Sequence, residues 1–383
     1  PPFGQALVGG GVAILYLAVY AALHLYDLVN AVTGGGLLVA VTMLAAVEAD
    51  RLRSESLAIV AVVGGFGTPF LVGFGPTAQL TLFSYTALLI AATVYLARRR
   101  DWPALNLMSF LLTGLMVTVW HAWFYRPSAY LTTELFFTLY CGLFLWVLYL
   151  MRTSSHPIAR WVRLALWTTP VWYHAASLTI LGDNRLALLV YLIAVTGVGL
   201  AVSVRWEAMW IRVLLWAAVA APLLEWANFQ PNGSWLAPAV VTWLAVAGMH
   251  AAAQIELLRR GRALLPAADV LLIPANGLGL YFGLQAVLDP HRQALTGLVA
   301  LLLAVAHGAL TIVTRRVEPR AAMHFLVVAV TLAVVAVAVQ LDGAWVTMLW
   351  ATEAGGLIWV GLRERRTWIR TGGALLLGVS VLR

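Results

Sequence analysis

The sequence has no lysine and only one cysteine. All 24 of its basic residues are arginines, which points to the coding bias of a GC-rich genome more than to a mechanism. The lone Cys141 lies in the apolar stretch FFTLYCGLFLW, so the chain carries neither a disulfide framework nor a CxxC metal or redox motif. Cysteine chemistry therefore gives no indication of function.

Charge is scarce as well. Only 10% of the 383 residues are charged, whereas 62% are hydrophobic and the mean hydropathy is +0.89. Soluble domains carry about a quarter charged residues, so this composition predicts a protein with many membrane-spanning segments. The net charge of +8 would suggest nucleic acid as the partner of a soluble chain. Here it follows from arginines placed in loops, and no nucleic-acid partner is expected.

Familiar catalytic and nucleotide-binding motifs are missing. The sequence has no GxxxxGK(S/T), HExxH or GxSxG unit, and no GxGxxG between a strand and a helix. These motifs carry phosphate binding, zinc chemistry and nucleophilic catalysis in large enzyme classes. The sequence therefore favours a protein that is not an enzyme, with no catalytic residues and no metal site.

Apolar runs separated by polar residues predict about fourteen membrane-spanning helices and a partial fifteenth. The runs are Gln5 to Tyr26, Thr33 to Glu48, Leu57 to Phe74, Gln79 to Ala97, Ala104 to Tyr125, Tyr130 to Met151, Trp161 to Leu181, Leu186 to Val204, Met209 to Phe229, Trp235 to Leu258, Ala267 to Leu288, Ala294 to Thr314, Ala321 to Leu341, Ala344 to Leu362 and Thr371 to Val381. The expected fold class is all-α, a polytopic integral membrane protein of tandem helical hairpins. We expect a single transmembrane domain over residues 1–383, without a soluble domain.

The two ends of the sequence predict that it is an internal piece of a longer chain, truncated at both ends. It opens with Pro1 rather than methionine. It stops ~13 residues after Arg370, whereas a span needs ~20.

Arginine-rich and arginine-poor loops alternate along the chain. A cluster follows every even-numbered span, and these clusters hold 20 of the 24 arginines. The odd loops hold only Arg126, Arg185 and Arg292. Because positively charged loops stay in the cytoplasm, the first residue is expected on the extracytoplasmic side. The clusters recur roughly every 47 to 60 residues, which indicates a repeated unit of helix, short basic turn and returning helix.

The hairpin over residues 340–370, QLDGAWVTMLWATEAGGLIWVGLRERRTWIR, shows this unit most clearly. Its first helix is predicted to start at Asp342-Gly343 and to run to Arg363. At ~1.5 Å per residue, Glu353 lies ~16 Å below Asp342, near the middle of a ~30 Å hydrocarbon core. Its carboxyl is either neutral or hydrogen-bonded to a neighbouring helix, which the small residues after it allow to approach, or it faces a water-filled path.

Three stretches together resemble one family. They are GQALVGGGVAILYLAVYAALHLYDL (residues 4–28), LAIVAVVGGFGTPFLVGFG (57–75) and DGAWVTMLWATEAGGLIWVGLR (342–363). Their GGG-aromatic start, GGF-x-TP and W-x-x-E-x-x-x-L-x-x-x-G patterns are similar to the bacterial predicted membrane proteins grouped as domain of unknown function 2339. The resemblance implies a polytopic protein of the bacterial cytoplasmic membrane, usually with more helices and often a coiled-coil N-terminal segment. It implies no activity.

Ionisable residues inside spans mark candidate sites, because each costs about 2.5 to 3.5 kcal/mol to insert. Many fall towards the extracytoplasmic side. Counted from the helix ends, this level holds His24, Asp27, His121, Glu134, His174, Glu225, Asn228, Gln285, Asp289 and His291, with the arginines Arg126, Arg185 and Arg292. A lined, outward-facing polar cavity would gather such groups. Taken singly, each is also accounted for as an interfacial residue wetted by lipid head groups.

Two spans contain residues that break helices. The run Pro274-Ala-Asn276-Gly-Leu-Gly predicts an interruption in the middle of the eleventh span, with Asn276 satisfying exposed backbone. Thr68-Pro69 predicts a similar break in the third span. Broken helices often line substrate sites in transporters, although plain packing kinks explain both runs as well.

Other ionisable residues have a structural interpretation. Glu48, Glu256 and Asp269 lie near basic loops, where pairing with arginine is expected. His250 and His307 both lie about fifteen residues below the outer ends of their spans, a placement that would suit two axial ligands of haem. Two packed core histidines explain the pair more simply, and no cofactor is expected.

These observations support three functions. The first is a transporter, flippase or lipid-handling protein that takes a lipid or lipid-linked envelope substrate from an extracytoplasmic-side cavity. The second is a structural or assembly subunit of a larger membrane complex, and the third is a membrane-embedded transferase with a lipid-linked donor. Expected partners are membrane lipids and, for the second function, other subunits. The candidate substrate-binding residues are Glu353, His174, Glu225, His121, Glu134, Arg126, Asn276 and Gln285.

Overall fold

The computed structural model describes residues 2–73, 75, 78–228, 235–260, 267–292, 295–341, 344–363, 365 and 367–382, without the side chains of residues 2, 226–228, 267–268 and 289–292. Regular structure within these ranges is helical, and none of it is strand. The predicted start of a helix at Asp342-Gly343 lies outside the described residues.

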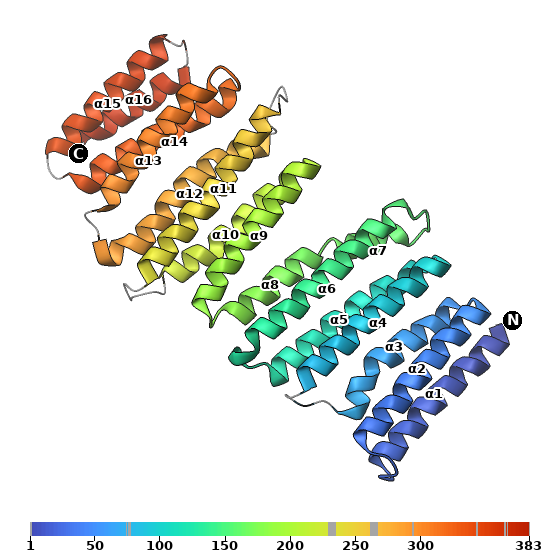
Figure 1. Cartoon of the computed structure of the whole chain (residues 1–383). Helices are drawn as coiled ribbons and strands as arrows, with labels where there is room; N and C mark the ends of the chain where they lie inside the picture. The colour runs from blue at the N-terminus through green and yellow to red at the C-terminus, as the bar shows by residue number, and fades with distance from the viewer. Residues whose placement is uncertain are drawn as a thin grey trace. The chain divides into compact units, whose positions relative to one another are not determined.

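The helices follow one another with short connections (Figure 1). They are α1 (Pro2–His24), α2 (Ala31–Leu52), α3 (Glu55–Val72), α4 (Gln79–Arg100), α5 (Pro103–Phe124), η2 (Pro127–Ala129), α6 (Tyr130–Leu150), η3 (Met151–Thr153), α7 (Ala159–Leu166), α8 (Thr169–Leu181), α9 (Arg185–Trp206), α10 (Met209–Asn228), α11 (Leu236–Arg259), α12 (Ala267–Arg292), α13 (Thr296–Thr314), α14 (Pro319–Gln340), α15 (Ala344–Arg363) and α16 (Thr367–Leu382). Eleven stretches of the described chain are long and apolar enough to cross a membrane. The prediction of an all-α, polytopic membrane protein is confirmed.

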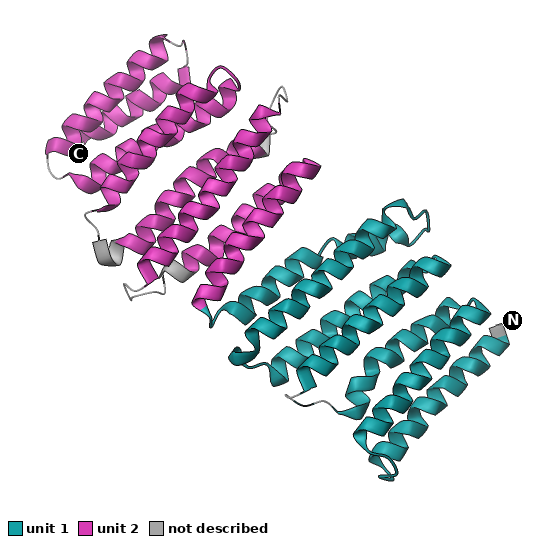
Figure 2. Cartoon of the chain, in the orientation of Figure 1, with its two compact units in different colours: residues 1–184 teal, residues 185–383 magenta. Residues whose placement is uncertain are grey.

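The helices form two compact units, residues 1–184 and residues 185–383, called unit 1 and unit 2 here (Figure 2). Unit 1 contains α1 to α8 and unit 2 contains α9 to α16. Each unit is described by itself, so the prediction of one transmembrane domain over the whole chain stays a prediction.

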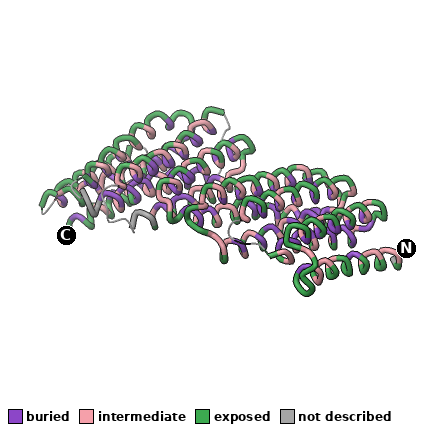
Figure 3. Tube along the Cα trace, turned by 60° about the horizontal axis from the view of Figure 1, so that its bottom comes forward, coloured by how far each residue is buried: buried purple, intermediate pink, exposed green. Residues whose placement is uncertain are grey.

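Inside each unit, many helices pack against the next helix, against the next but one, or against both. In unit 1, α3 contacts α2 and α5, and α6 contacts α4 and α8; in unit 2, α12 contacts α10, α11, α13 and α14. Each unit is therefore a double row of helices (Figure 1). Buried residues lie where helices face one another, and exposed residues cover the outer faces (Figure 3). Those outer faces carry large apolar side chains such as Val32 and Leu375, which suits contact with lipid.

Four short turns after arginine-rich helix ends share one backbone conformation. Arg53, Asp101, Glu207 and Arg365 have φ angles of 50°, 55°, 59° and 53°, in the left-handed region. After the first three, the next backbone N–H donates to the carbonyl five residues earlier, at 2.9–3.0 Å. This is the hydrogen bond of a Schellman motif, which satisfies a carbonyl that the helix end leaves free. The same turn occurs in both units and supports the interpretation as tandem hairpins.

The breaks predicted at two prolines are wrong. Helix α12 runs unbroken through Pro274, and α3 runs unbroken through Thr68-Pro69. Proline lacks an N–H, so Pro69 leaves the carbonyl of Gly65 without its helical partner. The Tyr85 hydroxyl of α4 donates to that carbonyl at 2.9 Å. A neighbouring helix thus supplies the missing hydrogen bond, and α3 stays continuous.

The seventh span, predicted as one helix from Trp161 to Leu181, is two helices, and this prediction is wrong. Helix α7 ends at Leu166 and α8 begins at Thr169, just before Pro170. The Thr169 hydroxyl donates to the Leu166 carbonyl at 2.6 Å, which takes the place of the N–H that Pro170 lacks. The break therefore lies at a Thr-Thr-Pro sequence that satisfies its own backbone.

The predicted ion pairs near the basic turns are confirmed. Glu48 lies 3.1 Å from Arg51, and Glu256 lies 2.9 Å from Arg260. Both are exposed pairs within one helix end, and such pairs contribute about 0–1 kcal/mol.

The third predicted pair is of a different kind. Asp269 of α12 is fully buried, and it pairs with Arg212 of α10, whose exposed fraction is 2%. The Arg212 Nε donates to one carboxylate oxygen of Asp269, Nη2 donates to the other, and Nη1 donates to the Ser203 carbonyl at 3.2 Å. This bidentate pair joins α10, α12 and α9 inside unit 2.

Candidate functional site

Glu134 lies in the second turn of α6, at the arginine-poor end of unit 1. Its Oε1 accepts a hydrogen bond from the Tyr173 hydroxyl at 2.7 Å and from the Ser177 hydroxyl at 2.9 Å. Both donors belong to α8, which packs against α6. Ser177 is completely buried. The carboxyl of Glu134 is therefore held between two helices by neutral hydroxyl groups.

The helical repeat explains why these side chains meet. Residues four positions apart lie on one face of a helix, which places Tyr173 above Ser177 on α8 and Glu134 above Thr138 on α6. The hydroxyls of Thr138 and Tyr173 are 2.9 Å apart, and Thr138 also donates to the Glu134 backbone carbonyl at 2.8 Å. Two short polar stripes thus face each other along the contact of α6 and α8.

The second carboxyl oxygen of Glu134 is open to a further partner. Oε2 is buried, and no hydrogen bond reaches it from the part of the chain that the structure describes. A buried acceptor without a donor costs about 1–3 kcal/mol. The site can recover this free energy by accepting a hydrogen bond from a ligand, an ammonium group or water.

The connection after α5 is hydrogen-bonded to α8. The Tyr125 hydroxyl donates to the Ile180 carbonyl of α8 at 2.7 Å, and the Tyr125 ring stacks on His121 with centroids 4.7 Å apart. Burial raises the pKa of the Tyr125 hydroxyl, and the nearby carboxyls of Asp183 and Glu134 raise it further. The end of α5 therefore lies within electrostatic reach of the Glu134 carboxyl.

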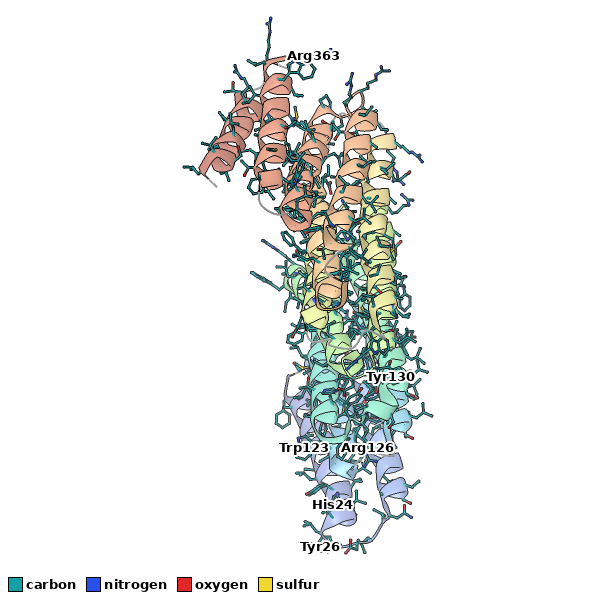
Figure 4. The ribbon with its side chains drawn as sticks, turned by 90° about the vertical axis from the view of Figure 1, so that its left-hand side faces the viewer. His24, Tyr26, Trp123, Arg126, Tyr130 and Arg363 are labelled. Carbon is teal, nitrogen blue, oxygen red and sulfur yellow. The ribbon has the colours of Figure 1, made fainter. Side chains whose placement is uncertain are left out.

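Three of the predicted site residues lie on the helices around this region. Glu134, His121 and His174 are half-buried on α6, α5 and α8, and His174 directly follows Tyr173. The fourth residue of unit 1 in the predicted set, Arg126, is exposed in the connection between α5 and α6. Figure 4 labels it at the same level as Trp123.

The other four predicted residues lie on three helices of unit 2, α10, α12 and α15. Glu225 of α10 is exposed, and Gln285 of α12 is half-buried. The side chain of Asn276 donates to the Ala247 carbonyl of α11 at 2.9 Å, so it bonds a neighbouring helix rather than its own backbone. Within the described residues no contact joins these side chains to one another or to Glu353.

Glu353 of α15 is half-buried, and no hydrogen bond to it occurs in the described residues. The next residue, Ala354, is fully buried where α15 meets α16. There a Cβ placed on Gly373 would lie 2.9 Å from the Ala354 carbonyl, so the two helices approach as closely as glycine allows. The predicted close approach of a neighbouring helix is confirmed, and the role of Glu353 as a binding residue stays a prediction.

The remaining residues of the predicted outer level have separate surroundings. His24 Nε2 lies 2.6 Å from the Leu71 carbonyl, and Asp27 is exposed with a φ of 50°. Arg185 lies over the Trp235 ring at 5.8 Å. The side chains of Asn228, Asp289, His291 and Arg292 lie outside the described residues.

His250 and His307 lie on α11 and α13, which both pack against α12. His250 is buried and its Nε2 has no hydrogen bond from the described chain, whereas Nδ1 of His307 is 2.7 Å from the Leu303 carbonyl of its own helix. Among the residues that the structure describes, no group of three or more His, Cys, Asp or Glu side chains could hold a metal ion.

Tyr173, Ser177 and Thr138 are not among the predicted site residues. The predicted residues are ionisable groups at a given depth, with Asn276 and Gln285, whereas these three are uncharged hydroxyl residues. Their signal was the spacing of four residues in Glu134-x-x-x-Thr138 and in Tyr173-x-x-x-Ser177, which predicts two polar faces that need a common partner.

Comparison with known proteins gives one match. The model of the family described as "Predicted membrane protein (DUF2339)" matches residues 1–185, a range that ends one residue past unit 1. Neither the curated proteins nor the solved structures gave a match. The stretch 342–363 lies beyond the matched range, so its resemblance stays a prediction. Over residues 1–185 the chain therefore matches the predicted membrane proteins of the domain of unknown function 2339, the family that its motifs indicated.

Proposed function

We propose that unit 1 binds the head group of a lipid or lipid-linked envelope substrate at the Glu134 site, as one step in transporting, flipping or otherwise handling that substrate. The proposal places the arginine-poor end of unit 1 on the extracytoplasmic side of a bacterial cytoplasmic membrane. The arginine-rich turns would then lie in the cytoplasm, as the charge distribution predicts.

The observation that carries the proposal is the buried Oε2 of Glu134. Two hydroxyls fix the carboxyl through Oε1, while Oε2 has no donor from the described chain. Only a group with an N–H or O–H can fill that position favourably, because the oxygens of a carboxylate are acceptors. A head group with an ammonium or hydroxyl has such a donor, whereas a choline head group has none.

The surroundings of Glu134 suit a head group of mixed character. Arg126 is exposed at the edge of the region and offers a guanidinium, the side chain best suited to a phosphate. The paired rings of His121 and Tyr125 and the half-buried His174 add polar groups at the same end of unit 1. A phosphate at Arg126 and an amine or hydroxyl at Glu134 together describe a phospholipid head group.

The test compares two head groups that differ in hydrogen-bond donors. The protein is placed in nanodiscs with equal amounts of phosphatidylethanolamine and phosphatidylcholine carrying the same acyl chains, and retained lipid is identified by native mass spectrometry. We expect enrichment of phosphatidylethanolamine, and a roughly tenfold loss of that enrichment in Glu134→Gln, because charge-assisted hydrogen bonds contribute about 1.5–3 kcal/mol. Glu225→Gln is the matched control, since Glu225 is an exposed acid at the arginine-poor end of α10.

A second measurement tests whether the protein moves lipid between the two leaflets. In vesicles that contain a trace of acyl-labelled fluorescent phosphatidylethanolamine, dithionite quenches only the outer leaflet, so lipid exchange between leaflets appears as extra quenching. The proposal expects exchange in wild type and its loss in Glu134→Gln. Enrichment without exchange would limit the function to binding. If neither occurs and Glu134→Gln only changes stability, the network is structural, and the assembly-subunit interpretation gains support.

A further inference from the structure

An apolar groove runs between α14, α15 and α16 in unit 2. Its volume is about 290 Å³. Its walls include Val327, Val330 and Thr331 of α14, Leu357 of α15, and Trp368 and Gly372 of α16. Gly372 has no atom within 4 Å of the position where a Cβ would stand, so the wall of α16 is open there.

The groove begins near the arginine-rich ends of its helices and extends towards their middle. On α14 it runs from Leu326 to Val335, ten residues that span ~13 Å at ~1.5 Å per residue. On α16 it begins at Trp368, the second residue of the helix. In a membrane this position covers the level of the head groups and the first part of the acyl chains.

Arginines lie at the same ends of the three helices whose side chains line the groove, although none of them is part of its wall. Arg320 is exposed and stands seven residues before Val327, so both lie on one face of α14. Arg370 of α16 packs over Gly361, one turn past Leu357 on α15, where a Cβ on Gly361 would lie 2.7 Å from its Cγ. Figure 4 shows Arg363 at the end of α15.

These arginines have no acidic partner within the described chain, because no ion pair there involves Arg320, Arg363 or Arg370. The nearby Glu318 is buried and accepts a hydrogen bond from the Arg320 backbone as the cap of α14. The Nε of Arg370 is buried and has no hydrogen bond from described residues. A guanidinium with an unused buried donor at the mouth of a groove offers a site for an anion.

We propose that this groove holds one acyl chain of an anionic phospholipid, whose phosphate binds Arg370 and Arg320. The apolar walls alone do not select a lipid, since a chain gains no hydrophobic free energy on moving from bilayer to groove. The walls favour a chain that fits the groove, because an unfilled gap would lose dispersion contacts. The arginines favour an anionic head group. Each basic residue near an anionic lipid contributes about 1 kcal/mol of binding free energy.

The test compares an anionic with a zwitterionic head group, and all variants are made in a Glu134→Gln background because the hydroxyls of phosphatidylglycerol are also donors for Glu134. Nanodiscs contain equal amounts of phosphatidylglycerol and phosphatidylcholine with identical acyl chains, and native mass spectrometry counts the lipids that each variant retains. The background protein is expected to retain phosphatidylglycerol in preference. Arg370→Gln and Arg320→Gln are each expected to lower that preference about fivefold, which corresponds to about 1 kcal/mol. Gly372→Leu is expected to lower it as well, because the new side chain fills the groove.

Two matched controls separate this site from general effects. Gly378→Leu changes an exposed glycine of the same helix that also has nothing within 4 Å of a Cβ and does not line the groove. Arg259→Gln removes an exposed arginine from the corresponding end of α11. Both variants are expected to keep the preference of the background protein.

Three results would overturn the inference: no preference for phosphatidylglycerol in the background protein, an unchanged preference in Gly372→Leu, or a stoichiometric polypeptide cross-linked to residue 372 in place of lipid. None of them bears on Glu134, because that site lies in unit 1 and is removed in the Glu134→Gln background.

Discussion

Asp269 in unit 2 and Glu134 in unit 1 both carry a carboxyl group near a helix end, and the two carboxyls are satisfied differently. In unit 2, the Asp269 carboxylate has a guanidinium on both oxygens and is fully enclosed. In unit 1, Glu134 has two neutral hydroxyls on one oxygen and nothing from the described chain on the other. Asp269 thus has the partners of a structural group, whereas Glu134 keeps one acceptor oxygen unused by the described chain.

The difference shows that burial alone does not identify a functional acid. A buried charge must be neutralised or paired, and Arg212 does this for Asp269 through a bidentate pair. A partly satisfied carboxyl costs free energy that a folded protein keeps only when something else compensates for it. Counting the unused lone pairs of each acid therefore ranks the candidate sites better than depth does.

The largest effect is expected for Asp269→Asn. The amide leaves the Arg212 guanidinium buried without a counter-charge, and breaking a buried pair in this way costs about 3–5 kcal/mol. The midpoint of thermal unfolding in detergent measures the loss. A double variant, Arg212→Met with Asp269→Leu, removes both charges and is expected to recover most of the stability. An Asp269→Asn protein as stable as wild type would refute the structural role of the pair.

Tyr173→Phe is expected to have the next largest effect. It removes one of the two hydroxyls that donate to Glu134 Oε1 and leaves Ser177 as the donor there; a hydrogen bond to a charged group contributes about 1.5–3 kcal/mol. Unfolding in detergent measures the change. Tyr149→Phe is the control, because Tyr149 is an exposed tyrosine on α6. Equal stabilities of the two variants would mean that the Tyr173 hydroxyl does not hold the carboxyl.

Both units have turns with a residue of positive φ, and glycine at these positions is expected to raise stability by a smaller amount. Asp101 in unit 1 and Arg365 in unit 2 have positive φ, which costs a non-glycine residue about 1–2 kcal/mol. Asp101→Gly and Arg365→Gly are therefore each expected to raise the free energy of unfolding by about 1 kcal/mol. The matching alanine variants keep the Cβ and should not gain. A gain in only one unit would show that the two turns are not equivalent.

The smallest effect on stability is expected for Glu134→Gln. The amide oxygen can accept the same two hydroxyl hydrogen bonds, so the free energy of unfolding should change by less than about 1 kcal/mol. The difference in stability loss between this variant and Asp269→Asn, measured under the same conditions, shows whether the two acids have different roles. A loss as large as that of Asp269→Asn would place Glu134 among the structural groups.

The fold could be predicted largely because its signals are local. Apolar runs and arginine clusters mark the helices and their turns, and the pairs at Glu48 and Glu256 lie within a single helix end. The breaks could not be predicted from proline alone. Whether a helix breaks depends on which group donates to the carbonyl that proline leaves free. At Gly65 the donor is Tyr85 of another helix and α3 continues. At Leu166 the donor is Thr169, which lies at the break itself.

The candidate site was predicted in part. Insertion cost draws attention to Glu134, His121 and His174, because charge within a span is visible in the sequence. The partners Tyr173 and Ser177 could not be assigned to Glu134, since the contact of α6 with α8 is a tertiary fact. Asn276 was singled out for a break that does not exist, and its amide instead bonds α11.

The recurring left-handed turn affects how related chains can gain or lose helical hairpins. A hairpin crosses the membrane twice, so its gain or loss leaves the orientation of every later helix as it was. Because the turn sets the return of each helix through backbone geometry, a new hairpin needs little sequence in common with its neighbours to join the row. Relatives can therefore differ by whole hairpins and still present the remaining helices to the same sides of the membrane.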